Sequence, residues 1–182
     1  MRVIAGEVGG RRIKAPKGRR TRPTADRIRE ALFSTIAPWL PGAQVLDLYA
    51  GSGAVGIEAI SRGASSAVFV ESDPQAVRVI RENLATLGLA DHARLIHSDA
   101  LRAIPGLIRM GHRFRLIFLD PPYRISVEPV LARVASARLV ERGGLVVVQH
   151  FSKTALPPLS DLTLWKTKRY GETTLTFLRV GE

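Results

Sequence analysis

Short apolar runs and amphipathic segments alternate along most of the chain. Short segments typical of strands, most of them rich in apolar residues, lie at residues 45–50, 67–71, 93–99, 115–120 and 144–150. Segments with helical periodicity lie at residues 54–63, 73–88 and 126–140. This alternation predicts an α/β fold with a parallel, doubly wound sheet and helices on both of its faces.

The two ends of the chain follow different patterns. Residues 162–170 and 173–180 flank a Gly-Glu turn and predict an antiparallel hairpin, and residues 2–14 predict a smaller one. Residues 15–22 are basic and are predicted to form a loop. A helix is expected next, with Thr24 as its N-cap, because apolar residues then recur on one face up to residue 36. Residues 1–182 are predicted to form a single domain.

Composition limits the chemistry that is available. The 182 residues are 46% apolar, which is enough for a folded core. The absence of cysteine excludes disulfides, thiolate metal sites and cysteine nucleophiles, including those of cytosine carbon-5 methylation. The sequence has no apolar run typical of a signal peptide or a membrane span. A cytoplasmic protein with no membrane contact, no metal and no obligate protein partner is therefore expected.

Positive charge is concentrated at the start of the chain. Residues 1–30 hold ten Lys or Arg side chains and three acidic ones, so they supply +7 of the net charge of +11. Arginine predominates, and its planar guanidinium suits phosphates and nucleic-acid bases. The alternative is a solvated arm that only improves solubility. The nucleic-acid-binding candidates in this region are Arg11, Arg12, Lys14, Arg19 and Arg20.

A glycine-rich loop directly follows the first predicted strand. Gly51, Gly53 and Gly56 have the spacing G-x-G-x-x-G, and Glu71 lies at the end of the second predicted strand. Glycines let a ligand approach the backbone closely, and the acid accepts hydrogen bonds from ribose hydroxyls. The pattern predicts a site for an adenosine-containing cofactor, either a nicotinamide dinucleotide or S-adenosylmethionine.

Two further carboxylates favour S-adenosylmethionine. Asp47 lies within the first predicted strand, where it would repel a pyrophosphate but accept a hydrogen bond from the ammonium of a methionine moiety. Asp99 ends the third predicted strand and suits the amino group of adenine. Asp99 also suits the N-cap of a following helix, and both roles stay open.

The fourth predicted strand ends in Asp120-Pro121-Pro122-Tyr123. Two prolines cannot continue a central strand, so a carboxylate and an aromatic ring lie at its end. In the methylation of an exocyclic amine, the Asp120 carboxylate and the Pro121 carbonyl would accept the two amino hydrogens and orient the lone pair. Tyr123 would stack on a flipped base. The alternative is a strand that stops at proline, with a capping aspartate.

The chain resembles the RsmD-type bacterial methyltransferases, which modify the N2 of a guanine in small-subunit (16S) ribosomal RNA. The resemblance covers residues 2–180 and rests on RVIAGEVGGRRI, RPTADRIREALFSTI, VLDLYAGSGAVGIEAISRGA, FLDPPY and YGETTLTFL. It implies a seven-stranded Rossmann-like methyltransferase sheet with an antiparallel last strand. Residues 1–22 would be a basic hairpin and loop extension, and residues 23–182 the methyltransferase core.

The resemblance also implies roles for particular residues. It assigns contacts with S-adenosylmethionine to Asp47, Gly51, Gly53, Glu71 and Asp99, to which we add their neighbours Ala50, Ser52, Ser72 and Ala100. It assigns recognition of the target base to Asp120, Pro121, Pro122 and Tyr123. It places Arg22, Thr24 and Arg27 at the mouth of the site, where RNA would enter.

The sequence thus leads to one hypothesis with three alternatives. The hypothesis is an S-adenosylmethionine-dependent guanine-N2 methyltransferase that acts on small-subunit rRNA in an assembled or partly assembled subunit. A DNA amino-methyltransferase acting on adenine N6 or cytosine N4 would use the same core. An NAD(P)-dependent oxidoreductase and a non-catalytic nucleic-acid-binding protein are the other two alternatives.

Overall fold

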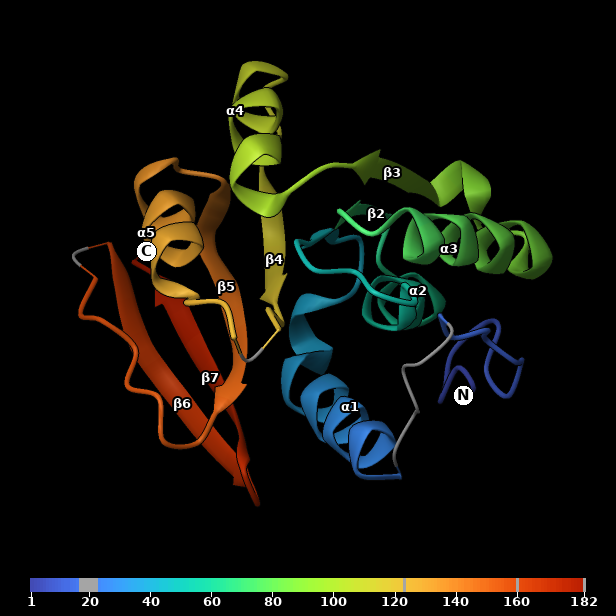
Figure 1. Cartoon of the computed structure of the whole chain (residues 1–182), viewed down its shortest axis with the longest axis horizontal. Coiled ribbons are helices and arrows are strands. Elements are labelled where there is room, and N and C mark those ends of the chain that lie inside the picture. Colours follow the sequence, from blue (N-terminus) through green and yellow to red (C-terminus); the bar gives the residue numbers. More distant parts are fainter. Residues whose placement is uncertain (17–22, 123, 160, 182) are drawn as a thin grey trace.

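A computed structural model of the chain describes residues 1–16, 23–122, 124–159 and 161–181. Within these residues, seven strands form one sheet in the order β3-β2-β1-β4-β5-β7-β6 (Figure 1). The strands are β1 (Gln44–Asp47), β2 (Ser66–Glu71), β3 (Ala93–His97), β4 (Phe114–Leu119), β5 (Val140–Phe151), β6 (Leu162–Tyr170) and β7 (Thr173–Val180). Strands β1 to β5 pair in parallel, whereas β7 is antiparallel to both β5 and β6. The predicted sheet is confirmed.

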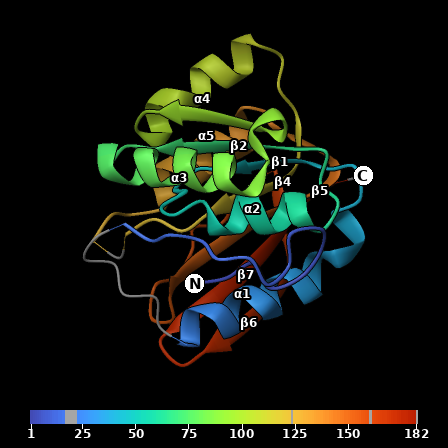
Figure 2. The same cartoon turned by 90° about the vertical axis from the view of Figure 1, so that its right-hand side faces the viewer.

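Helices cover both faces of the sheet (Figure 2). One face packs against α1 (Pro23–Ile36), α2 (Ala54–Ser61) and α3 (Pro74–Leu87), and the other against α4 (Ala100–Arg109) and α5 (Glu128–Ser136). Short 3-10 helices are η1 (Ala37–Trp39) and η2 (Ala90–His92). Adjacent residues of β1, β2, β4 and β5 face opposite clusters, which explains why these strands are apolar on both faces. No helix in the described ranges is long and apolar enough to cross a bilayer.

Helix α4 is absent from the predicted elements, although Asp99 was a candidate N-cap. The Asp99 carboxylate accepts hydrogen bonds from the backbone N–H groups of Leu101 (2.9 Å) and Arg102 (3.3 Å), so it does cap this helix. Pro105 and Gly106 lie inside α4. Both residues are poor helix formers, and they obscured the helical periodicity in the sequence.

Several element boundaries differ from the predictions. Helix α1 begins at Pro23, so Thr24 lies within the helix and is not its N-cap; proline suits the first helical position because its missing N–H is not needed there. Strand β1 ends at Asp47, and residues 48–50 begin the glycine loop. Strand β5 begins at Val140, and its register with β4 shifts between Phe114 and Leu116.

The N-terminal segment, residues 1–16, reverses direction as a hairpin does, but it forms no regular two-stranded ribbon. An isolated antiparallel bridge joins Arg2 to Arg12. Backbone hydrogen bonds from Val3 N to Arg11 O and from Ile13 N to Met1 O, both 3.0 Å, support the reversal. The predicted hairpin is therefore reduced to this one bridge.

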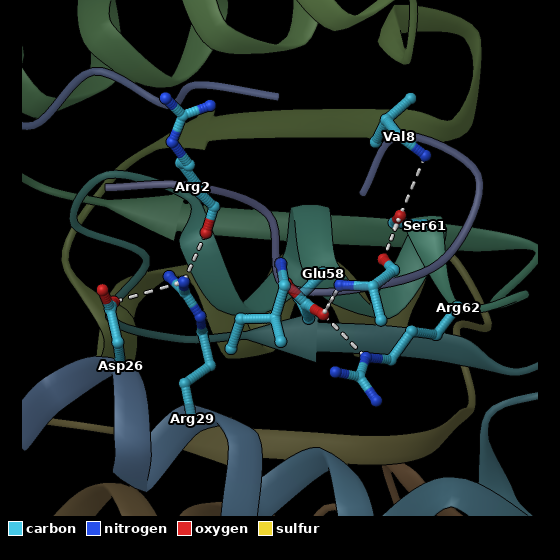
Figure 3. A network of polar contacts seen from close by, with 9 residues as sticks. Arg2, Val8, Asp26, Arg29, Glu58, Ser61 and Arg62 are labelled. Atoms are coloured by element: carbon cyan, nitrogen blue, oxygen red, sulfur yellow. Dashed lines mark hydrogen bonds and ion pairs between the residues drawn. The ribbon is translucent and has the colours of Figure 1, made fainter. Parts of the chain in front are cut away.

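Polar contacts with α2 dock the N-terminal segment on the folded body (Figure 3). The fully buried Glu58 carboxylate accepts hydrogen bonds from Ile4 N (2.7 Å), Ala5 N (3.0 Å) and the Arg62 guanidinium (2.7 Å). The Ser61 hydroxyl donates to the Ala5 carbonyl (2.6 Å). The side chains that the segment buries in the core are Val3, Val8 and Ile13. The segment is consequently part of the fold and not a loose arm.

Candidate active site

A cleft of about 750 Å³ lies at the carboxyl ends of the parallel strands. In a doubly wound sheet this edge is where ligands bind. The predicted site residues that line the cleft are Asp47, Ala50, Gly51, Ser52, Glu71, Ser72, Asp99, Ala100, Asp120, Pro121 and Pro122. Gly53 is not among the lining residues and forms the N-cap of α2. The structure thus gathers most of the candidates from four separate turns into one place.

The glycine loop depends on glycine at particular positions. Gly51 and Gly53 have φ values of 58° and 80°, a left-handed conformation that side chains with a Cβ disfavour. A Cβ on Gly56 would lie 2.3 Å from the ring of Phe69. Glycine there lets α2 begin directly against β2, so the loop can turn tightly between β1 and the helix.

Glu71 holds the glycine loop in place. Its carboxylate is buried and accepts hydrogen bonds from Gly51 N (2.7 Å) and from Ser72 N and Asp73 N (2.9 Å each). The sequence predicted only a ligand contact for this residue. A carboxylate has about four acceptor positions, so Glu71 can support the loop and still accept a hydrogen bond from a ribose hydroxyl.

Asp47 is a buried carboxylate with an unusual pKa. Burial, the nearby Asp120 and, to a lesser extent, Glu71 raise the pKa of Asp47 from 3.8 to about 7. Hydrogen bonds from the backbone of Tyr49 and Gly56 oppose this rise. A cationic ligand in the cleft would favour the charged form of Asp47, because an opposite charge lowers the pKa of a carboxyl.

Asp99 and Tyr49 both line the cleft and interact electrostatically. Asp99 is exposed, and its capping contacts with α4 leave acceptor capacity for a ligand. Burial and the negative charge of Asp99 raise the pKa of Tyr49 to about 12. The capping role of Asp99 is confirmed, whereas its contact with adenine stays a prediction. Tyr49 was not among the predicted site residues.

Helix α1 contributes a charged pair that the sequence analysis missed. Arg29 is buried, donates to the Arg2 carbonyl (2.5 Å) and lies 3.3 Å from an oxygen of Asp26 (Figure 3). Both residues line the cleft. Burial lowers the pKa of Arg29. The sequence did offer a signal, since Asp26, Arg29 and Phe33 share one helix face and Phe33 is apolar.

Two atoms of this pair have no hydrogen-bond partner. Asp26 Oδ1 and Arg29 Nε are buried atoms that form no hydrogen bond within the described part of the chain, although Oδ1 is the oxygen in ion-pair contact with Arg29. Buried polar atoms usually have partners, so the pair suits a ligand that carries both an ammonium and a carboxylate. A methionine moiety has this charge pattern. The residues of the cleft therefore fit S-adenosylmethionine.

Two of the basic candidates are engaged within the fold. The Arg11 guanidinium donates to the carbonyls of Leu87 (3.1 Å) and Thr86 (2.5 Å), at the C-terminus of α3. A cation at this position stabilises the helix, because the helix dipole is negative there. Lys14 Nζ lies 2.9 Å from the Glu82 carboxylate, and both side chains are exposed.

The remaining candidates are exposed or lie outside the described residues. Arg12 and Arg27 are exposed. The predicted residues outside the described ranges are Arg19, Arg20, Arg22 and Tyr123, and the side chain of Thr24 is also outside them. Over the described ranges, no group of three or more His, Asp or Glu side chains is placed to hold a metal ion.

Comparison with known proteins identifies the family. A family model described as "Conserved hypothetical protein 95" matches residues 1–179. Ribosomal RNA small subunit methyltransferase D of Escherichia coli is 42% identical over 124 residues, which are 68% of this chain and 61% of that protein. The Haemophilus influenzae protein of the same name is 31% identical over 173 residues, which are 94% and 89% of the two chains. The chain belongs to the RsmD family.

Solved structures agree with this assignment. A hypothetical protein of Thermus thermophilus is 37% identical, with a TM-score of 0.86 and 99% of each chain covered. A distant relative of the same fold, with 14% identity and a TM-score of 0.69, was solved with S-adenosylhomocysteine; the match covers 88% of this chain and 50% of that one. The RsmD-family chain is a methyltransferase that uses S-adenosylmethionine, and the nicotinamide alternative is set aside.

Proposed function

We propose that this RsmD-family enzyme methylates the exocyclic N2 of a guanine in small-subunit (16S) rRNA, within an assembled or partly assembled subunit. The names of the Escherichia coli and Haemophilus influenzae relatives support the class of RNA. The choice of guanine N2 follows from the resemblance to the family, because the acceptors at the end of β4 suit any exocyclic amine.

One observation carries the proposal. Strand β4 pairs with β1, with Asp47 opposite Phe118, so Asp120 follows β4 beside the glycine loop. Asp47 and Asp120 line the same cleft, and they are close enough for Asp120 to raise the pKa of Asp47. The acceptor for a target amine and the residues that fit the cofactor therefore share one edge of the sheet.

Asp120 and Pro121 orient the target amine. The lone pair of guanine N2 is delocalised into the ring, and it becomes nucleophilic when the two amino hydrogens are held out of the ring plane. The exposed Asp120 carboxylate and the backbone carbonyl of the buried Pro121 are the acceptors in this scheme. N2 forms a bond to the methyl carbon, the carbon–sulfur bond breaks, and Asp120 or water accepts the amino proton.

Residues that line the cleft would contact the cofactor. Asp26 and Arg29 complement the methionine ammonium and carboxylate, Glu71 accepts from the ribose, and Asp99 accepts from adenine. S-adenosylmethionine, when bound, supplies a methyl group on a sulfonium and leaves as S-adenosylhomocysteine. Asp47 also lines the cleft, and a cation bound nearby would favour its charged form.

The test supplies methyl-labelled S-adenosylmethionine with three substrates. These are small subunits that lack the modification, protein-free small-subunit rRNA and duplex DNA. We expect label in N2-methylguanosine from the subunits, and less from free rRNA. Label in DNA alone would retain the amino-methyltransferase chemistry and overturn the RNA substrate.

Replacing Asp120 tests its role directly. Asp120→Ala removes one of the two acceptors, and we expect turnover to fall by about 100-fold or more with little change in cofactor affinity. Asp91→Ala is the matched control, since Asp91 is an exposed aspartate in η2 that does not line the cleft. Wild-type turnover in Asp120→Ala would remove Asp120 from the mechanism.

A further inference from the structure

Asn83 on α3 is a buried polar residue that the roles described above do not use. Its side chain is 3% exposed. Its Oδ1 accepts from Lys14 N (2.9 Å), and its Nδ2 donates to Lys14 O and Ser52 O, both at 3.0 Å. Only an amide side chain offers one acceptor and two donors, and here all three functions are directed at backbone groups. Helix propensity gives no reason for asparagine at this position.

One partner of Asn83 belongs to the cofactor loop. Ser52 lies between Gly51 and Gly53, and it lines the cleft. The loop has a second polar support, because Glu71 accepts from Gly51 N (2.7 Å). Asn83 thus holds the carbonyl of Ser52, and Glu71 holds the N–H of the neighbouring Gly51.

The other partner belongs to the N-terminal segment. Asn83 forms two bonds with the backbone of Lys14, in the manner of a paired strand. The same segment contains the exposed Arg12, and residues Ala15 and Pro16 reach the lining of the cleft. The buried Asn83 side chain therefore joins the N-terminal segment to the glycine loop.

We propose that Asn83 is a positioning residue that couples the cofactor loop to the RNA-contacting N-terminal segment. The part of this inference that concerns RNA rests on the proposed function. Occupation of the loop fixes Ser52, which favours the arrangement in which Asn83 also holds Lys14. By linkage, an RNA that orders the segment strengthens cofactor binding by the same factor.

The first test uses the unmodified chain and no RNA. Hydrogen exchange of single amides is followed by NMR with and without saturating S-adenosylhomocysteine. We expect the Lys14 amide to exchange more slowly by about fivefold or more. The Val8 amide is the internal control, because it lies in the same segment but bonds to Ser61 (3.1 Å) instead of Asn83. An unchanged Lys14 amide, or equal slowing at Val8, would overturn the coupling.

The second test removes the side chain's polarity. Asn83→Leu keeps the number and branching of the side-chain heavy atoms but leaves backbone groups of Lys14 and Ser52 unpaired, and we expect affinity for S-adenosylhomocysteine to fall about tenfold. Glu82→Gln is the control, since it alters only the exposed pair with Lys14. A lower melting temperature with unchanged affinity would show that Asn83 supports the fold alone. Should Asn83→Leu not fold, the exchange measurement still decides the question.

The third test adds RNA. We expect S-adenosylhomocysteine to tighten the binding of unmodified small subunits by about fivefold or more in the wild type and to have no effect in Asn83→Leu. Wild-type enzyme that binds subunits equally with and without S-adenosylhomocysteine would overturn the coupling and leave the proposed function standing. Failure to bind subunits at all would instead overturn the proposed function, together with the RNA part of this inference.

Discussion

The cofactor edge of the sheet and the N-terminal segment are built from different kinds of information. At the cofactor edge, the decisive residues lie in short local patterns: a strand, a glycine turn, and an acid at the end of the next strand. The N-terminal segment is held by Glu58, Ser61 and Asn83, which lie 53 to 69 residues away from their partners in the chain. The first region can be predicted from spacing, whereas the second can be seen only once the chain is folded.

The number of basic residues can likewise be read from the sequence, whereas their contacts can be seen only in the folded chain. Ten basic residues in the first thirty predicted a surface for polyanions, but a count does not say where each charge is used. Arg11 caps α3, and Arg29 is buried beside Asp26. The exposed Arg12 and Arg27 stay candidates for contact with RNA. Part of the positive charge therefore stabilises the fold and does not contribute to the binding surface.

The largest expected effect on stability concerns the anchor of the N-terminal segment. Glu58→Ala leaves Ile4 N, Ala5 N and the Arg62 guanidinium without their acceptor. We expect the free energy of unfolding to fall by about 3–5 kcal/mol, as when one partner of a buried ion pair is removed. Chemical denaturation measures the change.

The control for Glu58→Ala is an exposed ion pair on α3. Glu82→Ala breaks the Lys14–Glu82 contact, whose side chains are 69% and 55% exposed, and it should cost less than about 1 kcal/mol. Similar losses in the two variants would mean that the segment is not anchored through Glu58, and the contrast between the two regions would disappear.

The cofactor edge should show a pH dependence of its own. The pKa of Asp47 rises from 3.8 to about 7 on folding, so between these values the folded state holds a proton that the unfolded state lacks. This group therefore makes the free energy of unfolding fall as pH increases from 4 to 7, by up to about 1.4 kcal/mol per pH unit. Asp47→Asn removes the contribution, so its stability relative to the wild type should increase toward pH 7.

Chemical denaturation of the wild type and of Asp47→Asn at several pH values measures the difference in their free energies of unfolding. Subtracting the two curves cancels the carboxylates that lie away from Asp47, so the difference reports Asp47 together with its interactions with Asp120 and Glu71. A difference that does not vary with pH would show that Asp47 is ionised throughout the range, and that Asp120 and burial do not perturb it.

The smallest expected effect separates the two roles of Asp99. Asp99→Ala should cost about 1 kcal/mol of stability because the N-cap of α4 is lost, whereas Asp99→Asn should cost only a few tenths, since asparagine also caps well. Affinity for S-adenosylhomocysteine is then measured by calorimetry in both variants. A normal affinity in Asp99→Ala would limit Asp99 to capping and remove its contact with adenine.

Much of the fold was predictable because its signals are local. Gly88 ends α3, Asp73 accepts from Gln75 N at its start (2.8 Å), and Val77, Ile80 and Leu84 form its buried face, as the periodicity indicated. Helix α4 was missed because Pro105 and Gly106 interrupt its pattern. The contacts of Glu71 with the glycine loop were not predictable, since the acid's position suggested a ligand and not a backbone partner.

The part of the site contributed by α1 shows a second limit. The charge count for residues 1–30 did not show that Asp26 and Arg29 form an ion pair at the cleft. The burial of Arg29 depends on how α1 packs beside the N-terminal segment, and the Arg2 carbonyl that Arg29 contacts is 27 residues away. A periodic pattern identifies the helix face but not what lies against it.

The position of β7 has a consequence for synthesis. This strand is made after β6, yet it lies between β5 and β6 in the sheet. Until residues 173–180 emerge, the long strand β5 has an open edge with unpaired backbone groups, which is a template for pairing with other chains. At roughly 5–20 residues per second, that interval lasts on the order of a few seconds. The candidate site residues that follow β1, β2 and β4 are made earlier, but Leu175 of β7 also lines the cleft, so the cleft is completed only when this open edge is closed.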